Sequence, residues 1–215
     1  PLDNATHCRI RDNLVTPWFT GPWLIWGRDS VNQETTMKQF NAEILNEYGP
    51  FHGAEQIHGV TFDGQRVWFA SGDKLNAIDP DSGKPVDSLN VPAQAGTAFD
   101  GHHIFQIADS QIQKVDPKTG EVLGTIPAPD GCSGLAWAEG SLWVGQYQAC
   151  KIHQLDPQTG KVLRSIESNR HVTGVTWIDS ELWHATWDGD DNEIRQIDPQ
   201  TGDVLKSIAM PHGVG

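Results

Sequence analysis

Ile-Asp-Pro-Gln-Thr-Gly at residues 197–202 is the last of four copies of one motif. The earlier copies are Ile-Asp-Pro-Asp-Ser-Gly at 78–83, Val-Asp-Pro-Lys-Thr-Gly at 115–120 and Leu-Asp-Pro-Gln-Thr-Gly at 155–160. Their Asp-Pro pairs begin at 79, 116, 156 and 198, so the motif recurs after 37, 40 and 42 residues. A period of about 40 residues is typical of a four-stranded β-propeller blade. The sequence therefore predicts four consecutive blades.

Each repeat contains the same four expected strands, here called A to D. Strand A ends on an aromatic residue and strand B carries another six residues later, which leaves room only for a tight turn. Strand C ends at the Asp-Pro turn, in which Pro fixes φ, Asp caps through its carboxylate and Gly takes a positive φ. The expected strands A are 59–62, 96–99, 134–137 and 174–177, the strand B aromatics are Trp68, Phe105, Trp143 and Trp183, and the expected strands D are 86–89, 122–126, 162–166 and 204–208.

Length varies in only one part of the repeat. From the strand B aromatic to the Asp-Pro pair the distances are 11, 11, 13 and 15 residues, whereas the rest of the repeat is nearly constant. In an up-and-down blade the A–B and C–D turns lie on one side of the disk, called the turn face below. The B–C loops and D–A connections lie on the other side, called the loop face. Insertions confined to one face are typical of a binding face.

The repeats cover 57–94, 95–130, 131–170 and 171–210, and we expect 37–215 to form a single propeller domain. Residues 1–36 do not match the repeat and could be an extension, a partner-binding arm or a poorly matched blade. Residues 212–215 resemble 58–61, the start of the first strand A. Phe40–Leu45 and Trp23–Trp26 also have strand character. We therefore predict an all-β propeller of four-stranded antiparallel blades, five-bladed with the last blade closed by N- and C-terminal strands; six blades are the alternative.

Composition excludes some partners. The chain has 15 Lys and Arg against 28 Asp and Glu, a formal net charge of −13, and no basic stripe, which argues against nucleic acid. No run is long and apolar enough for a membrane span, and the N-terminus lacks a signal-peptide pattern. We expect a soluble protein, cytoplasmic or exported with its signal removed, that binds a small molecule or a protein; the oligomeric state stays open.

Cys8, Cys132 and Cys150 are an odd number of cysteines at spacings that fit no zinc motif. The sequence favours small buried or partly exposed thiols. Cys132 and Cys150 belong to one repeat and could pair in an exported protein.

Residues 57–210 resemble bacterial propellers of the virginiamycin B lyase-like, glutamine cyclotransferase-like and YVTN-type repeat groups. The resemblance rests on Gly-x-x-Trp/Phe, Leu-Trp and Ile/Val/Leu-Asp-Pro-x-Thr-Gly-x-Val-Leu. It implies the propeller fold. For lyase-like members it also implies His and Glu residues with a divalent metal on one face, but this chain offers no residue-by-residue match to that set or to the acidic catalytic residue of the cyclotransferases.

Candidate site residues gather on the loop face. The residues at the start of each strand A, near the central channel, include histidines, a carboxylate and a thiol. The long B–C loops add aromatic and acidic residues. Imidazoles around an axis can hold a divalent metal or exchange protons, and clustered carboxylates suit Ca²⁺. The expected ligand-binding residues are Glu55, His58, Cys132, Tyr147, His171, His184, Trp187 and His212, and the expected ligands for a divalent metal (Ca, Mg or Zn) are His58, His212, Asp188 and Asp190.

Two functions follow from these residues. One is a binding module that presents the loop face to a small molecule or protein, with Tyr147 and Trp187 as walls. The alternative is a metal-assisted lyase, cyclotransferase or hydrolase that uses channel-mouth histidines. Propellers host both classes, so the sequence leaves open whether the chain is an enzyme.

Overall fold

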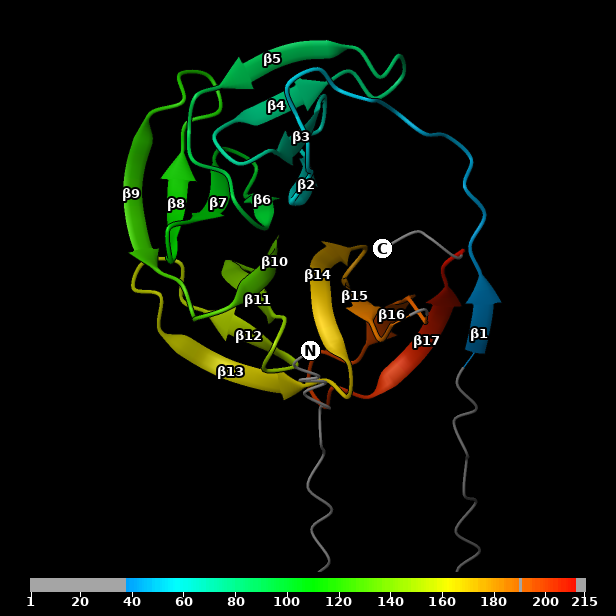
Figure 1. Ribbon diagram of the computed structural model, residues 1–215. Helices are drawn as coiled ribbons and strands as arrows, with labels where there is room; N and C mark the ends of the chain where they lie inside the picture. Colours follow the sequence, from blue (N-terminus) through cyan, green and yellow to red (C-terminus); the bar gives the residue numbers. More distant parts are fainter. Residues whose placement is uncertain (1–37, 190, 212–215) are drawn as a thin grey trace, which may run out of the picture.

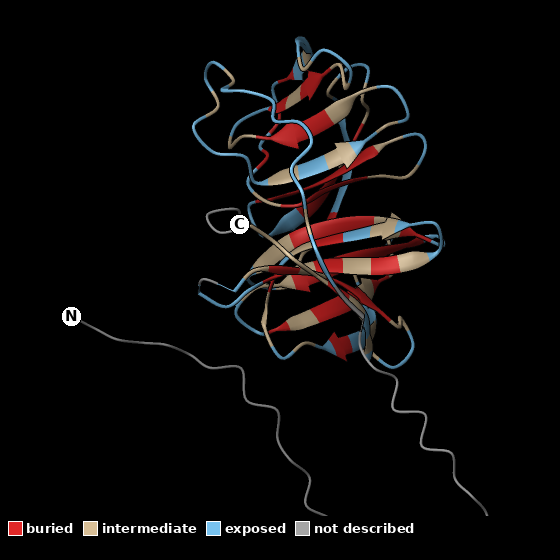
Figure 2. Cartoon of the chain, turned by 90° about the vertical axis from the view of Figure 1, so that its right-hand side faces the viewer, coloured by how far each residue is buried: buried red, intermediate tan, exposed pale blue. Residues whose placement is uncertain are grey.

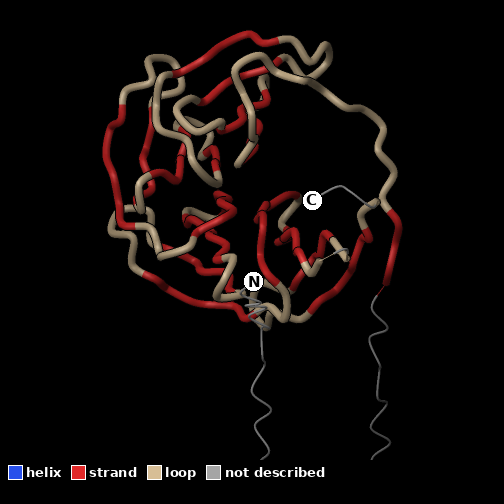
Figure 3. The backbone as a smooth tube through the Cα atoms, in the orientation of Figure 1, coloured by secondary structure: helices blue, strands red, loops and turns tan. Residues whose placement is uncertain are grey.

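The chain forms a ring of β-sheets (Figures 1 and 3) in a computed structural model that describes residues 38–189 and 191–211. These residues contain 17 strands in four sheets and no helix. Blade 1 comprises β2 (Gly59–Phe62), β3 (Val67–Ala70), β4 (Leu75–Ile78) and β5 (Pro85–Leu89). Blade 2 comprises β6 (Thr97–Phe99), β7 (Ile104–Ala108), β8 (Gln111–Val115) and β9 (Val122–Pro127).

The remaining strands form blades 3 and 4, most of whose strands are longer. Blade 3 comprises β10 (Cys132–Ala138), β11 (Ser141–Gln146), β12 (Lys151–Leu155) and β13 (Val162–Glu167). Blade 4 comprises β14 (His171–Ile178), β15 (Glu181–Trp187), β16 (Glu193–Ile197) and β17 (Val204–Ala209), with β1 (Lys38–Asn41) added outside β17. The four strands of each repeat are antiparallel and in sequence order, so the predicted blades and their A and D strands are confirmed.

The Asp-Pro turns have the expected mechanism. In the third copy, Asp156 accepts hydrogen bonds from the backbone N–H of Gln158 at 3.0 Å and of Thr159 at 2.8 Å. Gly160 has φ +72°, and an added Cβ would lie 2.8 Å from the carbonyl oxygen of Pro127 in the preceding blade. The turn glycine therefore serves both the local backbone conformation and the contact between blades.

Repeated aromatics hold neighbouring blades together. The ring of Trp137 on β10 stacks on Phe105 of blade 2 at 5.3 Å, and Trp177 on β14 stacks on Trp143 of blade 3 at 5.8 Å. Trp68 of blade 1 is fully buried in the cluster that Phe99 of blade 2 joins. Such pairs contribute about 0.5–1.5 kcal/mol each beyond their buried area. Figure 2 shows the buried residues within the sheets and the exposed ones mainly in turns and loops.

The prediction of five or six blades is wrong for the described residues, which form four sheets. β1 overlaps the expected strand Phe40–Leu45, but it pairs in parallel with β17 and so extends blade 4 instead of building another blade. This pairing covers the outer edge of β17, whose backbone groups would otherwise lack partners. From β1 the chain runs as residues 42–58 past a sector of the ring without a sheet (Figure 1). Trp23–Trp26 and residues 212–215 lie outside the described residues.

The two cysteines of the third repeat do not pair. Cys132 is a free thiol, and its Sγ donates to the carbonyl oxygen of Pro129 at 2.7 Å. Cys150 is disulfide-bonded. No helix among residues 38–189 and 191–211 is long and apolar enough to cross a membrane.

Candidate functional site

The loop face is held together by backbone hydrogen bonds between B–C loops and D–A connections. Ser168 N–H donates to Cys150 O at 2.8 Å, and Met210 N–H donates to Asn192 O at 2.9 Å. In the fourth repeat the inserted residues lengthen strand B as well as the loop, because β15 continues to Trp187 whereas β3 stops at Ala70. The loop face therefore extends furthest at blades 3 and 4.

Three rings from these two blades form one cluster, the three-ring cluster of Tyr147, His171 and Trp187. Tyr147 and His171 stack with centroids 4.6 Å apart and an interplanar angle of 17°. Trp187 is tilted against both rings, at 6.3 Å from Tyr147 and 6.0 Å from His171. Trp187 is 40% exposed, which is unusual for so large an apolar side chain and leaves it available for contact.

The backbone fixes the geometry of the cluster. His171 begins β14 and faces Trp187 of β15 in the antiparallel register, so their rings lie side by side. Tyr147 follows β11, and its N–H donates to the carbonyl of Gly131 at 3.1 Å. Nδ1 of His171 lies 3.1 Å from the carbonyl oxygen of Tyr147, and because a carbonyl only accepts, Nδ1 carries the proton. The cluster is thus preorganised across the junction between two blades.

Charged residues border the cluster on its blade 4 side. The guanidinium of Arg170 lies 2.9 Å from Asp191 and 4.0 Å from Asp188, whose side chains are 67% and 69% exposed. Glu193 is buried, lies 3.7 Å from Arg170 and accepts a hydrogen bond from Arg195 at 2.7 Å. Although burial opposes ionisation, hydrogen bonds and the nearby guanidinium groups lower the pKa of Glu193. The border therefore combines buried ion pairs with two exposed carboxylates.

Two of the predicted histidines line a different cavity, of about 330 Å³, between blade 4 and blade 1. His184 lies in the middle of β15 and is 3% exposed, and its Nδ1 has no hydrogen-bond partner among the described residues. Burial and the neighbouring Arg195 lower its pKa to about 4, so the imidazole is neutral near pH 7. His58 is exposed and lines the same cavity.

The other predicted site residues are spread apart. Glu55 is exposed in the coil before β2. Burial, with the nearby Asp130 carboxylate, raises the pKa of the Cys132 thiol to about 12, so it is not a nucleophile at neutral pH. Asp190 and His212 lie outside the described residues. Within the part of the chain that the structure describes, no three His, Cys, Asp or Glu side chains converge as a metal site would require.

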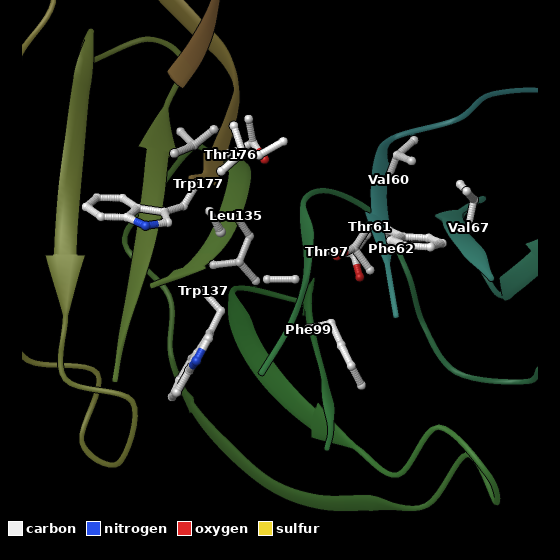
Figure 4. A pocket seen from close by; sticks show the side chains of 14 residues that line it. Val60, Thr61, Phe62, Val67, Thr97, Phe99, Leu135, Trp137, Thr176 and Trp177 are labelled. Atoms are coloured by element: carbon white, nitrogen blue, oxygen red, sulfur yellow. The ribbon is translucent and has the colours of Figure 1, made fainter. Parts of the chain in front are cut away.

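A second cavity, of about 450 Å³, is lined by the strands A of all four blades (Figure 4). Its walls carry the aromatics that pack blades together, such as Trp137 and Trp177, and the side chains of Thr61, Thr97 and Thr176. Because these residues occupy repeated positions, the cavity is part of the scaffold.

Sequence reasoning missed Arg170 and Arg195, which organise the charged border. Arg170 lies in the D–A connection before His171. Its positive charge does not recur in the other repeats, so the repeat pattern did not point to it. The acidic loop 188–193 was the available signal, because neighbouring carboxylates disfavour one another's charged forms and a nearby cation favours them.

The comparisons with known proteins agree with this architecture. A family model described as outer membrane protein assembly factor BamB matches residues 25–173. The chain belongs to this family. No curated protein matches the sequence of this BamB-family chain.

Solved structures with similar folds share little sequence with it. The glutaminyl cyclase of Myxococcus xanthus superposes with a TM-score of 0.68 at 18% identity, covering 81% of this chain and 78% of that one. A Bacteroides caccae protein of unknown function gives 0.53 at 18% identity (77% and 64% covered). Hydrazine synthase of Kuenenia stuttgartiensis gives 0.52 at 19% identity, covering 76% of this chain and 53% of that one. These likenesses establish the propeller fold, as the sequence motifs implied, and carry no activity over to the BamB-family chain.

Proposed function

We propose that the chain is a binding module whose loop face holds an extended polypeptide at the three-ring cluster. The observation that carries the proposal is the stack of Tyr147 on His171 beside the exposed ring of Trp187. Aromatic rings held rigidly at the surface are typical anchors of protein interfaces.

A polypeptide suits the cluster better than a small molecule. Small-molecule sites are concave and bury most of their ligand. The ring of Trp187 is 40% exposed, and the side chains of Asp188 and Asp191 near it are 69% and 67% exposed, which is typical of an open surface rather than of an enclosed cavity. The family description, an assembly factor for outer membrane proteins, also favours a protein partner.

The charged residues that border the three-ring cluster indicate the chemistry of that partner. Asp188 and Asp191 are exposed beside the rings, and the chain as a whole carries a net charge of −13. A Lys or Arg of the partner can pair with these carboxylates and lie over the Trp187 ring. The preferred partner is therefore an extended segment that alternates basic with aromatic or branched apolar residues.

The metal-assisted lyase, cyclotransferase or hydrolase has less support. It would need His58 with His212, or Asp188 with Asp190, and His212 and Asp190 lie outside the described residues. Asp188 follows Trp187 of the three-ring cluster, whereas His58 lines the cavity between blades 4 and 1, and Asp188 is not among the residues that line that cavity. For this reason we place the proposal on binding rather than on catalysis.

Fluorescence anisotropy tests the proposal with a labelled 12-residue peptide of alternating Lys, Tyr and Val. We expect the unaltered protein to bind it and Trp187→Ala to weaken the affinity at least about tenfold, as the loss of an aromatic anchor does. Leu163→Ala is the matched control, because Leu163 is 53% exposed on β13, away from the cluster. The Leu163→Ala variant should bind the peptide with the same affinity as the unaltered protein.

Two further measurements test whether opposite charges contribute to binding. Raising the salt concentration should weaken binding, and a peptide with Glu in place of Lys should bind much less tightly. Equal affinities for the unaltered protein and Trp187→Ala would contradict the proposed site, and preference for the Glu peptide would contradict the proposed partner.

A further inference from the structure

A residue with a hydroxyl group occupies the same position in strand D of every repeat. It pairs with a polar residue of strand C in the antiparallel register, so the two side chains lie side by side on one face of the blade. Among the four pairs, only that of blade 3 places a base beside the hydroxyl, because amides are not basic and the guanidinium of Arg stays protonated. From blade 1 to blade 4 the pairs are Ser88 with Asn76, Thr125 with Gln113, Ser165 with His153 and Ser207 with Arg195.

The pair of blade 3 belongs to a chain of hydrogen bonds. Nδ1 of His153 lies 2.7 Å from Oγ of Ser165, and Nε2 of the same ring lies 2.7 Å from Oε1 of Gln146. Gln146 comes two residues after Val144, the partner of His153 in β11, so its side chain lies on the same face of the sheet. The side-chain nitrogen of Gln146 donates to the carbonyl oxygen of Asp130 at 2.7 Å. Oε1 is therefore the atom of this amide that faces the imidazole.

These bonds fix the position of each proton. The amide oxygen of Gln146 only accepts, so Nε2 of His153 carries the ring proton. Nδ1 then has a lone pair and accepts a hydrogen bond from the hydroxyl of Ser165. Burial and the nearby Lys151 of β12 lower the pKa of His153, and Glu167 of β13 opposes this shift. The imidazole is therefore neutral at pH 7, and its Nδ1 is available as a base.

The base is sheltered, whereas the hydroxyl can be reached from solvent. His153 is 9% exposed, and Ser165 is an exposed residue of β13, the outermost strand of blade 3 (Figure 1). A serine that donates to a neutral imidazole, itself oriented by a third group, has the arrangement that activates a nucleophile.

We propose that Ser165 is an acyl acceptor whose Oγ attacks the carbonyl carbon of an activated ester, with His153 as the general base. The bond from Oγ to the carbonyl carbon forms while the hydroxyl proton passes to Nδ1 of His153. The bond from that carbon to the ester oxygen then breaks, and the leaving alcohol or phenol takes up the proton. Ser165 is left as an ester and His153 is neutral again. The donors are esters with a good leaving group, such as aryl esters, and the reaction does not depend on the binding of a polypeptide.

Acetylation by 4-nitrophenyl acetate tests the proposal, because Ser88 of the same molecule is a matched control. Ser88 is also exposed on the outermost strand of its blade, and its hydroxyl donates to Oδ1 of Asn76 at 3.1 Å instead of to a base. Tandem mass spectrometry follows both serines in the folded protein at pH 7. We expect Ser165 to be acetylated about 100-fold faster than Ser88, the contribution of a positioned general base. Rates that differ by less than about tenfold would overturn the proposal.

His153→Asn removes the base and reproduces in blade 3 the pair that blade 1 already contains. We expect the acetylation rate of Ser165 in this variant to fall to that of Ser88, and an unchanged rate would overturn the proposal.

The unaltered protein allows a second measurement that needs no variant. Because the pKa of His153 lies below its ordinary value of 6.5, the imidazole is neutral throughout the range from pH 7 to pH 8.5. The ratio of the Ser165 rate to the Ser88 rate should therefore be the same at both ends of this range. A ratio that rises with pH would assign the proton transfer to another group and would also overturn the proposal.

Discussion

The imidazole of His184 links the stability of the fold to pH. It is buried in β15 beside Arg195, and its pKa falls from 6.5 to about 4. Between these values the unfolded chain binds a proton that the folded chain does not, so stability is complete above pH 6.5 and is lost as the pH falls. The loss is of the order of 3 kcal/mol by pH 4, because each unit of pKa difference corresponds to about 1.4 kcal/mol.

Denaturant unfolding of the unaltered protein and of His184→Gln, between pH 7 and pH 4.5, measures this contribution. The variant should show a shallower pH dependence. Part of the slope should remain, because burial also lowers the pKa of His153. Identical slopes would mean that His184 is solvated or protonated in the native state.

Among the structural elements, the Asp-Pro turn is the one whose chemistry follows most directly from sequence. Gly160→Val places a β-branched residue at φ +72° and a Cβ 2.8 Å from the carbonyl oxygen of Pro127. We expect a loss of unfolding free energy of the order of 2 kcal/mol. Peptide binding by the folded protein should not change, because this turn lies on the turn face.

The same substitution at Gly124 is the control for the turn. Gly124 lies in β9, has ordinary φ and has open space around its added Cβ, so Gly124→Val should be nearly neutral. Chemical denaturation of both variants measures the difference. A neutral Gly160→Val, or one that selectively weakens peptide binding, would contradict the assignment of a purely structural turn.

Some features of the strands and turns could be predicted from the sequence alone, and others could not. Strands A and D and the turns could be predicted because each leaves a repeated local mark, such as the aromatic of Trp143 or the glycine of Gly160. The stacking of Tyr147 on His171 could not, because it joins two blades through residues that do not repeat. The position of β1 was missed for a related reason, since parallel pairing with β17 leaves no turn signal between the two strands.

On the scale of the whole molecule, the N-terminal part of the described chain ties blade 4 to blade 1. β1 covers the outer edge of β17, and the hydroxyl of Tyr48 donates to the carbonyl oxygen of Pro80 at 2.7 Å. The ring of Phe51 stacks on Phe69 at 4.8 Å. Residues 38–51 therefore bridge blade 4 and blade 1.

Replacement of residues 38–50 by a Gly-Ser linker of equal length should lower the melting temperature and broaden the unfolding transition, because it exposes the edge of β17 and removes the Tyr48 contact. Size-exclusion chromatography should show self-association through that edge. Tyr48→Phe, which removes only the hydrogen bond, is the milder control and should cost about 1 kcal/mol or less. A linker variant that stays monomeric and equally stable would show that the bridge contributes nothing.

We propose that a polypeptide binds at the three-ring cluster on the loop face of this BamB-family propeller. Site-specific photo-crosslinking tests it most directly, with a photoreactive amino acid in place of Gln148, beside Tyr147, or in place of Gln158, on the turn face. Both residues are exposed, so the positions differ in face and not in accessibility. We expect the alternating Lys, Tyr and Val peptide to crosslink at 148 and not at 158, and Trp187→Ala to remove the product. Crosslinking that is equal at both positions, or confined to 158, would contradict the proposed site.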